Sequence, residues 1–246
     1  MTINLLIDSG NTCFKWATVD EFGQLTKHSV FNEQLSEASL RSAWSELERP
    51  EQIAYSSVSA TAILAWVQTV ATVLWPEVPL IVARSEAQAF GVCNAYQQPE
   101  KLGVDRWLAL VATHHYYPGP ACIVDCGTAI TVDLMNEQGQ HQGGLISPGL
   151  RLMRQSLAQG TANLAFDNET YETGLSNFTA AAIHNGTLFA AVGLITQVLN
   201  TQAEATPLIL TGGDAEHIVP HLSVNATLDT DLVLRGLAVL LQKKAA

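Results

Sequence analysis

One short pattern occurs twice in this chain, about half its length apart. Residues 7–16 read IDSGNTCFKW and residues 124–134 read VDCGTAITVDL. In both, an apolar run ends in Asp, one small residue, Gly, and then Asn-Thr or Thr. An apolar run followed by turn residues such as Asp, Asn and Gly is typical of a strand that enters a tight turn. We therefore expect a duplicated scaffold, with the same strand, carboxylate and glycine turn at the start of each half.

The rest of the chain supports two similar halves. Its 246 residues suffice for one large domain or for two of about 120 residues. Pro118-Gly119-Pro120 is the strongest chain punctuation and predicts a boundary there, with domains at 1–118 and 119–246. Strands are expected at 3–8, 13–19, 53–58, 79–83, 121–125, 130–135, 140–147 and 207–211, and helices at 36–48, 60–74, 104–115, 149–158, 178–199 and 231–244. This alternation predicts an α/β fold of two domains facing each other across a cleft.

Charge and composition exclude several classes of function. The net charge is −11, and no Lys or Arg occurs between Arg154 and Arg235, which argues against a nucleic-acid surface. The N-terminus lacks a basic segment of the signal-peptide type, and the uncharged stretch 52–76 is too polar for a membrane span. Four cysteines without a CxxC pair fit reduced thiols. We expect a soluble cytoplasmic protein without nucleic-acid or membrane partners.

The repeated turn contains the groups that bind phosphate. Asp alone is a common turn residue, but two copies at corresponding places favour a binding role. Gly10 and Gly127 allow the backbone to approach a bulky anion, and the amides around them can donate to it. Further donors and carboxylates come from the same two segments: Asn11, Thr12, Thr128, Lys15, Asp8 and Asp125. Asp8 and Asp125 can position a metal ion, because Mg²⁺ keeps several waters and takes only one or two carboxylates. Phosphate-binding turns together with such carboxylates predict phosphoryl transfer. The GxxxxGK[ST], GxGxxG, HRD and DFG motifs are absent, which excludes a P-loop, a Rossmann or a protein-kinase site.

A candidate group for activating a nucleophile lies at Gly103-Val104-Asp105-Arg106-Trp107, where a loop precedes a helix. Asp105 can accept a proton from a substrate hydroxyl, and Arg106 can pair with a carboxylate or phosphate. The alternative is an ordinary helix start in which Asp105 favours the N-terminal dipole. Spacing alone does not choose between the two interpretations.

Four segments in order, DSGNTCFK, NAYQQPEKLGVDRW, DCGTAITVD and GGLISPGL, resemble the type III pantothenate kinases. The resemblance extends from residue 3 to DLVLRGL at 231–237. It implies two RNase H-like domains of the actin, sugar kinase and Hsp70 type, with ATP held between them, and a homodimer. The implied reaction is ATP-dependent phosphorylation of pantothenate to 4'-phosphopantothenate, the first step of coenzyme A biosynthesis.

The resemblance also implies roles for individual residues. The first phosphate-binding segment would comprise Asp8, Ser9, Gly10, Asn11, Thr12, Cys13, Phe14 and Lys15, with Asp8 as a candidate Mg²⁺ ligand. The pantothenate site would comprise Tyr96, Gly103, Val104, Asp105, Arg106 and Thr179, with Asp105 as the proton acceptor. Asp125 would bind a monovalent cation, K⁺ or NH₄⁺, Thr128 would contact ATP, and Gly212-Gly213-Asp214 would border the adenosine. Phe178 departs from the family pattern, which has a small or polar residue there.

Two alternative functions use the same fold. One is another small-molecule kinase of the sugar type, or a phosphohydrolase; the other is a non-enzymatic ATP-binding regulator. The oligomeric state rests on residues 177–200, an expected helix without any charged residue. A helix that is apolar on more than one face must bury more than one face, either inside one subunit or against a partner. The pattern leaves both open, and the resemblance favours the dimer, with Thr179 near the subunit interface.

Overall fold

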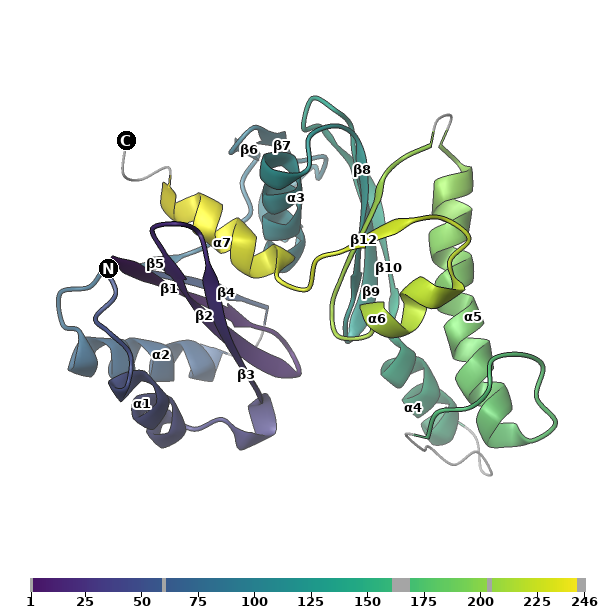
Figure 1. Ribbon diagram of the computed structural model, residues 1–246, viewed down its shortest axis with the longest axis horizontal. Coiled ribbons are helices and arrows are strands. Elements are labelled where there is room, and N and C mark those ends of the chain that lie inside the picture. Colours follow the sequence, from purple (N-terminus) through teal and green to yellow (C-terminus); the bar gives the residue numbers. More distant parts are fainter. Residues whose placement is uncertain (1, 59–60, 161–168, 203–204, 243–246) are drawn as a thin grey trace. The chain divides into compact units, whose positions relative to one another are not determined.

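The computed structural model describes residues 2–58, 61–160, 169–202 and 205–242 (Figure 1). The chain forms two compact units. One consists of Met1–Pro118 together with Asp231–Ala246, and the other of Gly119–Thr230. The chain therefore passes from the first unit to the second at Pro118-Gly119 and returns to the first unit at its end.

The first unit contains a five-stranded sheet in the order β3-β2-β1-β4-β5. Its elements are β1 (Ile3–Ser9), β2 (Cys13–Asp20), β3 (Leu25–Phe31), α1 (Glu37–Ser45), β4 (Ile53–Ser57), α2 (Thr61–Leu74), β5 (Leu80–Val82), β6 (Gln88–Ala89), β7 (Val92–Cys93), α3 (Val104–Tyr116) and α7 (Leu232–Gln242). The first three strands are antiparallel neighbours, whereas β4 runs parallel to β1 and β5 runs parallel to β4.

The second unit repeats this topology. Its sheet has the order β10-β9-β8-β11-β12. The elements are β8 (Ala121–Cys126), β9 (Ala129–Met135), β10 (His141–Pro148), α4 (Leu150–Gly160), α5 (Thr179–Asn200), β11 (Leu208–Thr211), α6 (Ala215–Ile218) and β12 (Ala226–Leu228). Again three antiparallel strands are followed by two parallel ones. The duplicated scaffold expected from the repeated turn is therefore present in both sheets.

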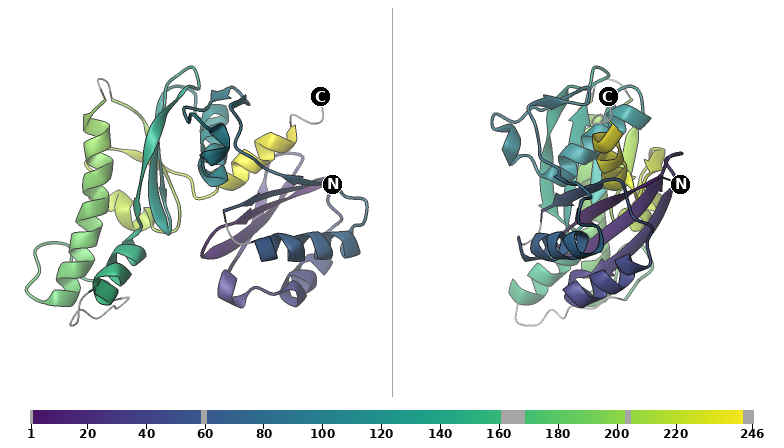
Figure 2. Two further views of the ribbon diagram at one scale, coloured as in Figure 1. Left: turned by 180° about the vertical axis from the view of Figure 1, so that it is seen from behind. Right: turned by 90° about the vertical axis from the view of Figure 1, so that its left-hand side faces the viewer.

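Alternating side chains give the first sheet two apolar faces. Leu5, Ile7, Phe14 and Trp16 pack with α1 and α2 on one face. Leu6, Ala17 and Ala54 pack with α3 and α7 on the other. Figure 2 shows α1 and α2 on one side of this sheet and α7 on the other. The position of Leu6 matters for the site, because Asp8 follows it by two residues and points to the same face.

The last helix differs from the sequence-based assignment. The sequence places residues 231–244 in the second domain, but α7 packs against α3 and β1 in the first unit. Gly236 explains how closely the two helices approach, because a Cβ atom there would lie 2.3 Å from the carbonyl oxygen of Leu108. Lys27 of β3 also binds Asp231 at 2.9 Å, just before α7. An apolar helix pattern does not say which sheet the helix covers.

The core of the second unit lies between its sheet and helices α4, α5 and α6. Val124 and Ile130 from the sheet meet Leu188 and Ile195 of α5 there. By length and composition alone, α5 is apolar enough to cross a membrane, and 33% of its most apolar window is buried within the described structure. Core helices of soluble proteins pass the same test, so this is weak evidence for a span.

Candidate functional site

The first repeated turn joins β1 to β2 and places Asp8 opposite Lys15 in the strand register. The amide of Gly10 donates to the carbonyl of Cys13 at 3.0 Å, which closes the turn. Asn32 supports it from the end of β3, since its side chain donates to the carbonyl of Gly10 at 2.8 Å. The turn is thus a preformed loop that carries Asp8 and Lys15 on the sheet face covered by α3 and α7.

Asp8 is partly buried and has one hydrogen-bond donor from a neighbouring strand. The hydroxyl of Ser56 donates to Asp8 Oδ1 at 2.7 Å, because β4 runs parallel to β1 and sets Ser56 beside Asp8. Burial raises the pKa of the Asp8 carboxyl above its usual value. The Ser56 hydrogen bond and Lys15 lower this pKa, and the nearby charge of Asp105 raises it again. Asp8 is therefore a carboxylate whose charge would be stabilised by a cation.

The start of α3 brings the second group of predicted residues to the first unit's site. Asp105 lies in the first turn of α3, where its Oδ1 accepts from the amide of Arg106 at 2.8 Å. Gly103 allows this arrangement, because a Cβ atom there would lie 2.6 Å from Asp105 Oδ1. The charge of Asp105 contributes to raising the pKa of Asp8, so the two carboxylates interact electrostatically within the first unit. The sequence placed them almost a hundred residues apart.

Arg106 is buried and directed at Tyr96. Its Nη1 donates to the hydroxyl of Tyr96 at 2.8 Å, and its guanidinium lies 5.6 Å from the centroid of that ring. Asn94 holds the loop in place by accepting from the amide of Tyr96 at 3.0 Å and donating to the carbonyls of Glu86 and Pro99, each at 3.2 Å. The structure thus brings Tyr96 and Arg106 together, and their part in a pantothenate site stays a prediction.

The second repeated turn joins β8 to β9 and belongs entirely to the second unit. Val124 and Cys126 face the helical core, so Asp125 between them faces the opposite side, as Asp8 does in the first sheet. The amide of Gly127 donates to the carbonyl of Ala129 at 3.1 Å. The amide of Gly149 donates to the carbonyl of Thr128 at 2.9 Å. The end of β10 therefore supports this turn as Asn32 supports the first.

The Gly212-Gly213-Asp214 segment closes on the same turn. The amide of Asp214 donates to the carbonyl of Cys126 at 2.9 Å. Gly212 has a φ of +92°, and a Cβ atom there would lie 2.4 Å from Asp125 Oδ1, so only glycine fits without displacement. Burial raises the pKa of Asp214, while His217 and Arg154 lower it. The structure thus gathers Asp125, Thr128 and the glycine pair in one place.

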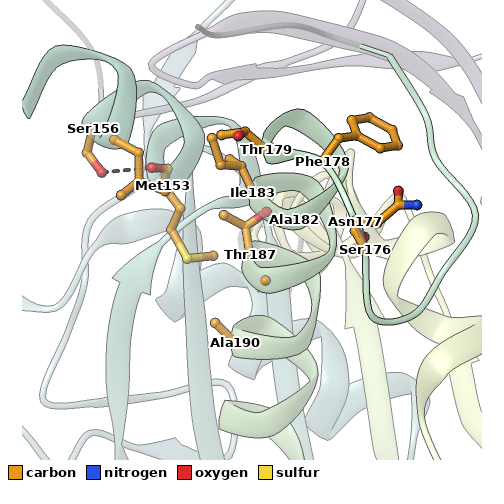
Figure 3. Close-up of a pocket in the computed structure, with 12 residues that line it drawn as sticks. Met153, Ser156, Ser176, Asn177, Phe178, Thr179, Ala182, Ile183, Thr187 and Ala190 are labelled. Atoms are coloured by element: carbon orange, nitrogen blue, oxygen red, sulfur yellow. Dashed lines mark hydrogen bonds between the residues drawn. The ribbon is translucent and has the colours of Figure 1, made fainter. Parts of the chain in front are cut away.

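Thr179, the remaining predicted site residue, is exposed at the start of α5 and lines a pocket of about 800 Å³ between α4 and α5. Figure 3 shows Met153 and Ser156 of α4 across from Thr179 and Ile183 of α5. Phe178, which departs from the family pattern, packs edge-to-face against Tyr171 with ring centroids 5.4 Å apart. All residues of this pocket belong to the second unit.

The residue types fit a magnesium nucleotide better than a protein-ligated metal. Among the residues that the structure describes, no group of three or more His, Cys, Asp or Glu side chains could hold a metal ion. Mg²⁺ needs no such cage, because it keeps waters and takes one or two carboxylates together with substrate phosphates. Asp8 fits that role, since burial makes its charge costly without a cation. Asp125 is the corresponding carboxylate of the second unit.

Sequence reasoning missed three residues that support these groups: Ser56 at Asp8, Asn94 at Tyr96 and Asn32 at Gly10. Ser56 had a usable signal, since the ends of adjacent parallel strands meet at one edge of a sheet. Asn94 and Asn32 lie in a loop and at a strand end, and nothing in the local pattern marks them.

Comparison with known proteins gives matches over nearly the whole chain. A sequence model of the type III pantothenate kinases matches residues 4–201. The type III pantothenate kinase of Nitrosococcus oceani is 38% identical over 254 residues, covering 95% of this chain and 92% of that protein. That of Laribacter hongkongensis is 36% identical over 242 residues, covering 95% and 96%.

Among solved structures, the activator of 2-hydroxyisocaproyl-CoA dehydratase from Clostridium difficile, with bound ADPNP, superimposes with a TM-score of 0.60 at 10% identity. The superposition covers 99% of this chain and 96% of that one. At this identity the likeness shows the fold alone. It is the actin-like ATPase fold, which confirms the predicted fold class.

Proposed function

Since the chain belongs to the type III pantothenate kinase family, we propose that it transfers the γ-phosphate of ATP to the primary hydroxyl of pantothenate, forming 4'-phosphopantothenate for coenzyme A biosynthesis. The observation that carries this proposal is that Asp105 at the start of α3 acts electrostatically on Asp8 of the first repeated turn, both in the first unit. This interaction couples a candidate proton acceptor to a candidate metal carboxylate, the two groups that transfer to a hydroxyl requires. We further infer that the enzyme acts in the cytoplasm.

Each residue has a distinct task in this proposal. Asp105 accepts the proton of the substrate hydroxyl as the oxygen attacks the γ-phosphorus, and ADP departs with the electrons of the broken P–O bond. Arg106, held by Tyr96, provides a cationic guanidinium for the pantothenate carboxylate. The amides of the turn at Gly10 and the ammonium of Lys15 offset negative charge on the phosphates. Ser9, Asn11, Thr12, Cys13 and Phe14 complete this phosphate-binding segment, and Gly103 and Val104 set the start of α3 for the substrate.

Two cations are part of the proposal. Mg²⁺, when bound with ATP, would neutralise developing charge on the phosphates, and Asp8 is its candidate protein ligand. Asp125 is the candidate ligand of a monovalent cation, K⁺ or NH₄⁺, and Thr128 on the same turn is the candidate ATP contact. Both carboxylates are the second-last residues of equivalent strands, β1 and β8, in the duplicated sheets.

Measured ADP release distinguishes this proposal from its alternatives. A coupled assay with Mg²⁺-ATP should show ADP release that requires pantothenate and is faster with potassium than with sodium. Release without pantothenate would identify a phosphohydrolase. Release with sugars but not with pantothenate would identify another kinase of this fold, and ATP binding without any release would identify a regulator.

We also infer a homodimer that pairs through α5. The exposed face of this helix includes Ala182, Gly186, Ala190 and Gly193, and α5 carries no charged residue. Among the residues that the structure describes, none comes within 4 Å of a Cβ atom built on Gly186 or Gly193, so another helix can approach closely. A charge-free helix face of this kind is stabilised by burial against another surface. The same face of a second copy can bury it in a two-fold symmetric dimer.

The dimer has a direct test if Thr179 serves the partner's substrate site. Asp105→Asn and Thr179→Ala proteins, each inactive alone, should regain activity when their subunits exchange, because some sites then hold both intact residues. Demonstrated exchange without recovered activity would contradict the shared site. An active monomer in analytical ultracentrifugation would contradict the dimer.

A further inference from the structure

The loop that leads into α5 is held by one buried side chain of that helix. Residues 172–178 have no helix or strand of their own, and Phe178 at the helix N-cap makes no side-chain capping bond. Gly174 within the loop has a φ of +150°. Side-chain contacts must therefore fix the direction in which the chain enters α5 at Thr179.

Asn185 supplies those contacts. Only 2% of this residue is exposed, and its Nδ2 lies 2.9 Å from the carbonyl oxygen of Glu172 and 3.0 Å from that of Gly174. The same nitrogen lies 3.0 Å from the hydroxyl oxygen of Ser176. The two N–H donors of one side-chain amide thus lie within hydrogen-bond distance of three acceptors spread over five residues of loop. Ser176 in turn donates to the carbonyl of Gly174 at 3.3 Å.

Asn185 is the side chain that joins these loop positions to α5. The Asn185 amide itself is buried and the carbonyls it contacts are partly shielded, while the amides of the α5 interior are committed to the helix's own hydrogen bonds. Removing the Asn185 amide would therefore release the loop from the helix, because the remaining Ser176–Gly174 bond lies within the loop itself. An aromatic contact acts in the same region, where Tyr171 packs edge-to-face against both Phe178 and His184.

We propose that Asn185 is a positioning residue for pantothenate: by clamping residues 172–176 against α5, it sets the placement of Thr179. This inference rests on the proposed function, in which Thr179 contacts the substrate. Because Asn185 is buried, it acts in this proposal through Thr179 and not by contacting the substrate. Its effect should therefore fall on the binding of pantothenate and not on that of ATP, whose candidate contacts at Asp8–Lys15 and Thr128 lie in other segments.

The test compares Asn185→Ala with a matched Asn136→Ala control. Asn136 also holds a loop of the second unit, since its Oδ1 accepts from the amides of Gln138 at 3.1 Å and Gln140 at 2.8 Å. That loop joins β9 to β10 and contains none of the proposed site residues. For Asn185→Ala we expect the KM for pantothenate to rise about tenfold, which corresponds to the free energy of roughly one hydrogen bond. The KM for ATP should stay within about twofold of the wild-type value.

Amide hydrogen exchange measures how firmly Asn185 holds residues 172–178, independently of enzyme activity. Amides of residues 172–178 should exchange about tenfold faster in Asn185→Ala and at the wild-type rate in Asn136→Ala. If Asn185→Ala fails to fold, Ser176→Ala removes one of the three acceptors and should shift the pantothenate KM in the same direction by a smaller factor.

Three results separate the possibilities. A pantothenate KM within about twofold of wild type, despite faster exchange of the loop, would overturn the positioning role. Equal increases in both KM values, matched by Asn136→Ala, would assign the effect to general destabilisation and overturn it too. If the unsubstituted protein shows no pantothenate-dependent ADP release, the proposed function fails and the substrate role of Asn185 fails with it, whereas faster loop exchange would still identify the clamp.

Discussion

Gly149 offers a sharp test of the second repeated turn, because it packs directly on the backbone of that turn. A Cβ atom at position 149 would lie 2.1 Å from the carbonyl oxygen of Gly127 and 2.6 Å from that of Thr128. Real Cβ contacts essentially never fall below 3.0 Å, so Gly149→Ala must separate the two segments by about 0.9 Å. Its φ lies outside the left-handed region, so the effect is steric and not one of backbone strain.

The expected cost is at the upper end for overpacking, since the obstructing atoms are backbone and cannot rotate away. Overpacking typically costs 1–3 kcal/mol, and we expect about 3 kcal/mol here. For a chain of this size that corresponds to a Tm lower by roughly 6–12 °C. The displaced turn carries Thr128, so the KM for ATP should also rise, whereas the KM for pantothenate should change less.

Differential scanning calorimetry and ADP-release kinetics measure the two effects. Gly160→Ala is the matched control, because Gly160 ends α4 and no atom of the described part of the chain lies within 4 Å of a Cβ atom built there. The Tm of this control should stay the same or rise slightly, since Ala favours a helix over Gly by up to about 1 kcal/mol. A Gly149→Ala protein with a wild-type Tm and an unchanged KM for ATP would refute the proposed role of Gly149 packing at this turn.

Four further outcomes are expected. Asp105→Asn should keep ATP binding in calorimetric titration and lose about 10²–10⁴-fold in kcat, so more than a third of wild-type activity would remove Asp105 from the mechanism. Asp8→Ala should shift the Mg²⁺ dependence of the rate and Asp125→Ala the potassium dependence; identical cation responses would show that this division of roles is wrong. Because burial raises the pKa of Asp8, the folded chain binds the proton of this carboxyl more tightly than the unfolded chain does. The contribution of Asp8 to stability therefore falls as the pH rises from the pKa of the unfolded chain to that of the folded chain. Asp8→Asn should therefore raise the Tm of the nucleotide-free protein at pH 8 and by less at pH 4, and a gain independent of pH would contradict this cause. Burial raises the pKa of Cys122 to about 12 and that of Cys126 further, so native iodoacetamide labelling at pH 8 should modify Cys13 and Cys93 first, as mass spectrometry can show.

Much of the fold follows from the pattern of the sequence. The repeated strand, carboxylate and glycine turn predicted two equivalent β-meanders, and both sheets have the same strand order. The strand β3 was not expected, because Leu25–Phe31 carries mostly exposed and polar side chains and shows no apolar alternation. The strand β12 has three residues, too few for a periodic signal.

For the candidate site, too, some residues could be predicted from the sequence and others could not. The residue types of a phosphate-binding turn are local, so Asp8, Gly10, Lys15, Asp125 and Thr128 stand out in the linear sequence as candidates. Their roles in the reaction remain predictions. The family resemblance contributed Tyr96 and Thr179, which no local pattern marks.

Only the tertiary structure decided which distant segments meet. Strand register set Ser56 beside Asp8, helix packing brought α7 to α3 through Gly236, and the course of one loop assigned its carbonyls to Asn185. Hydrogen bonds and close packing depend on distances between segments that are remote along the chain, and a sequence pattern records periodicity only within one segment. The sequence by itself therefore determined the repeated elements and their candidate chemistry, and the three-dimensional fold determined the partners that orient them.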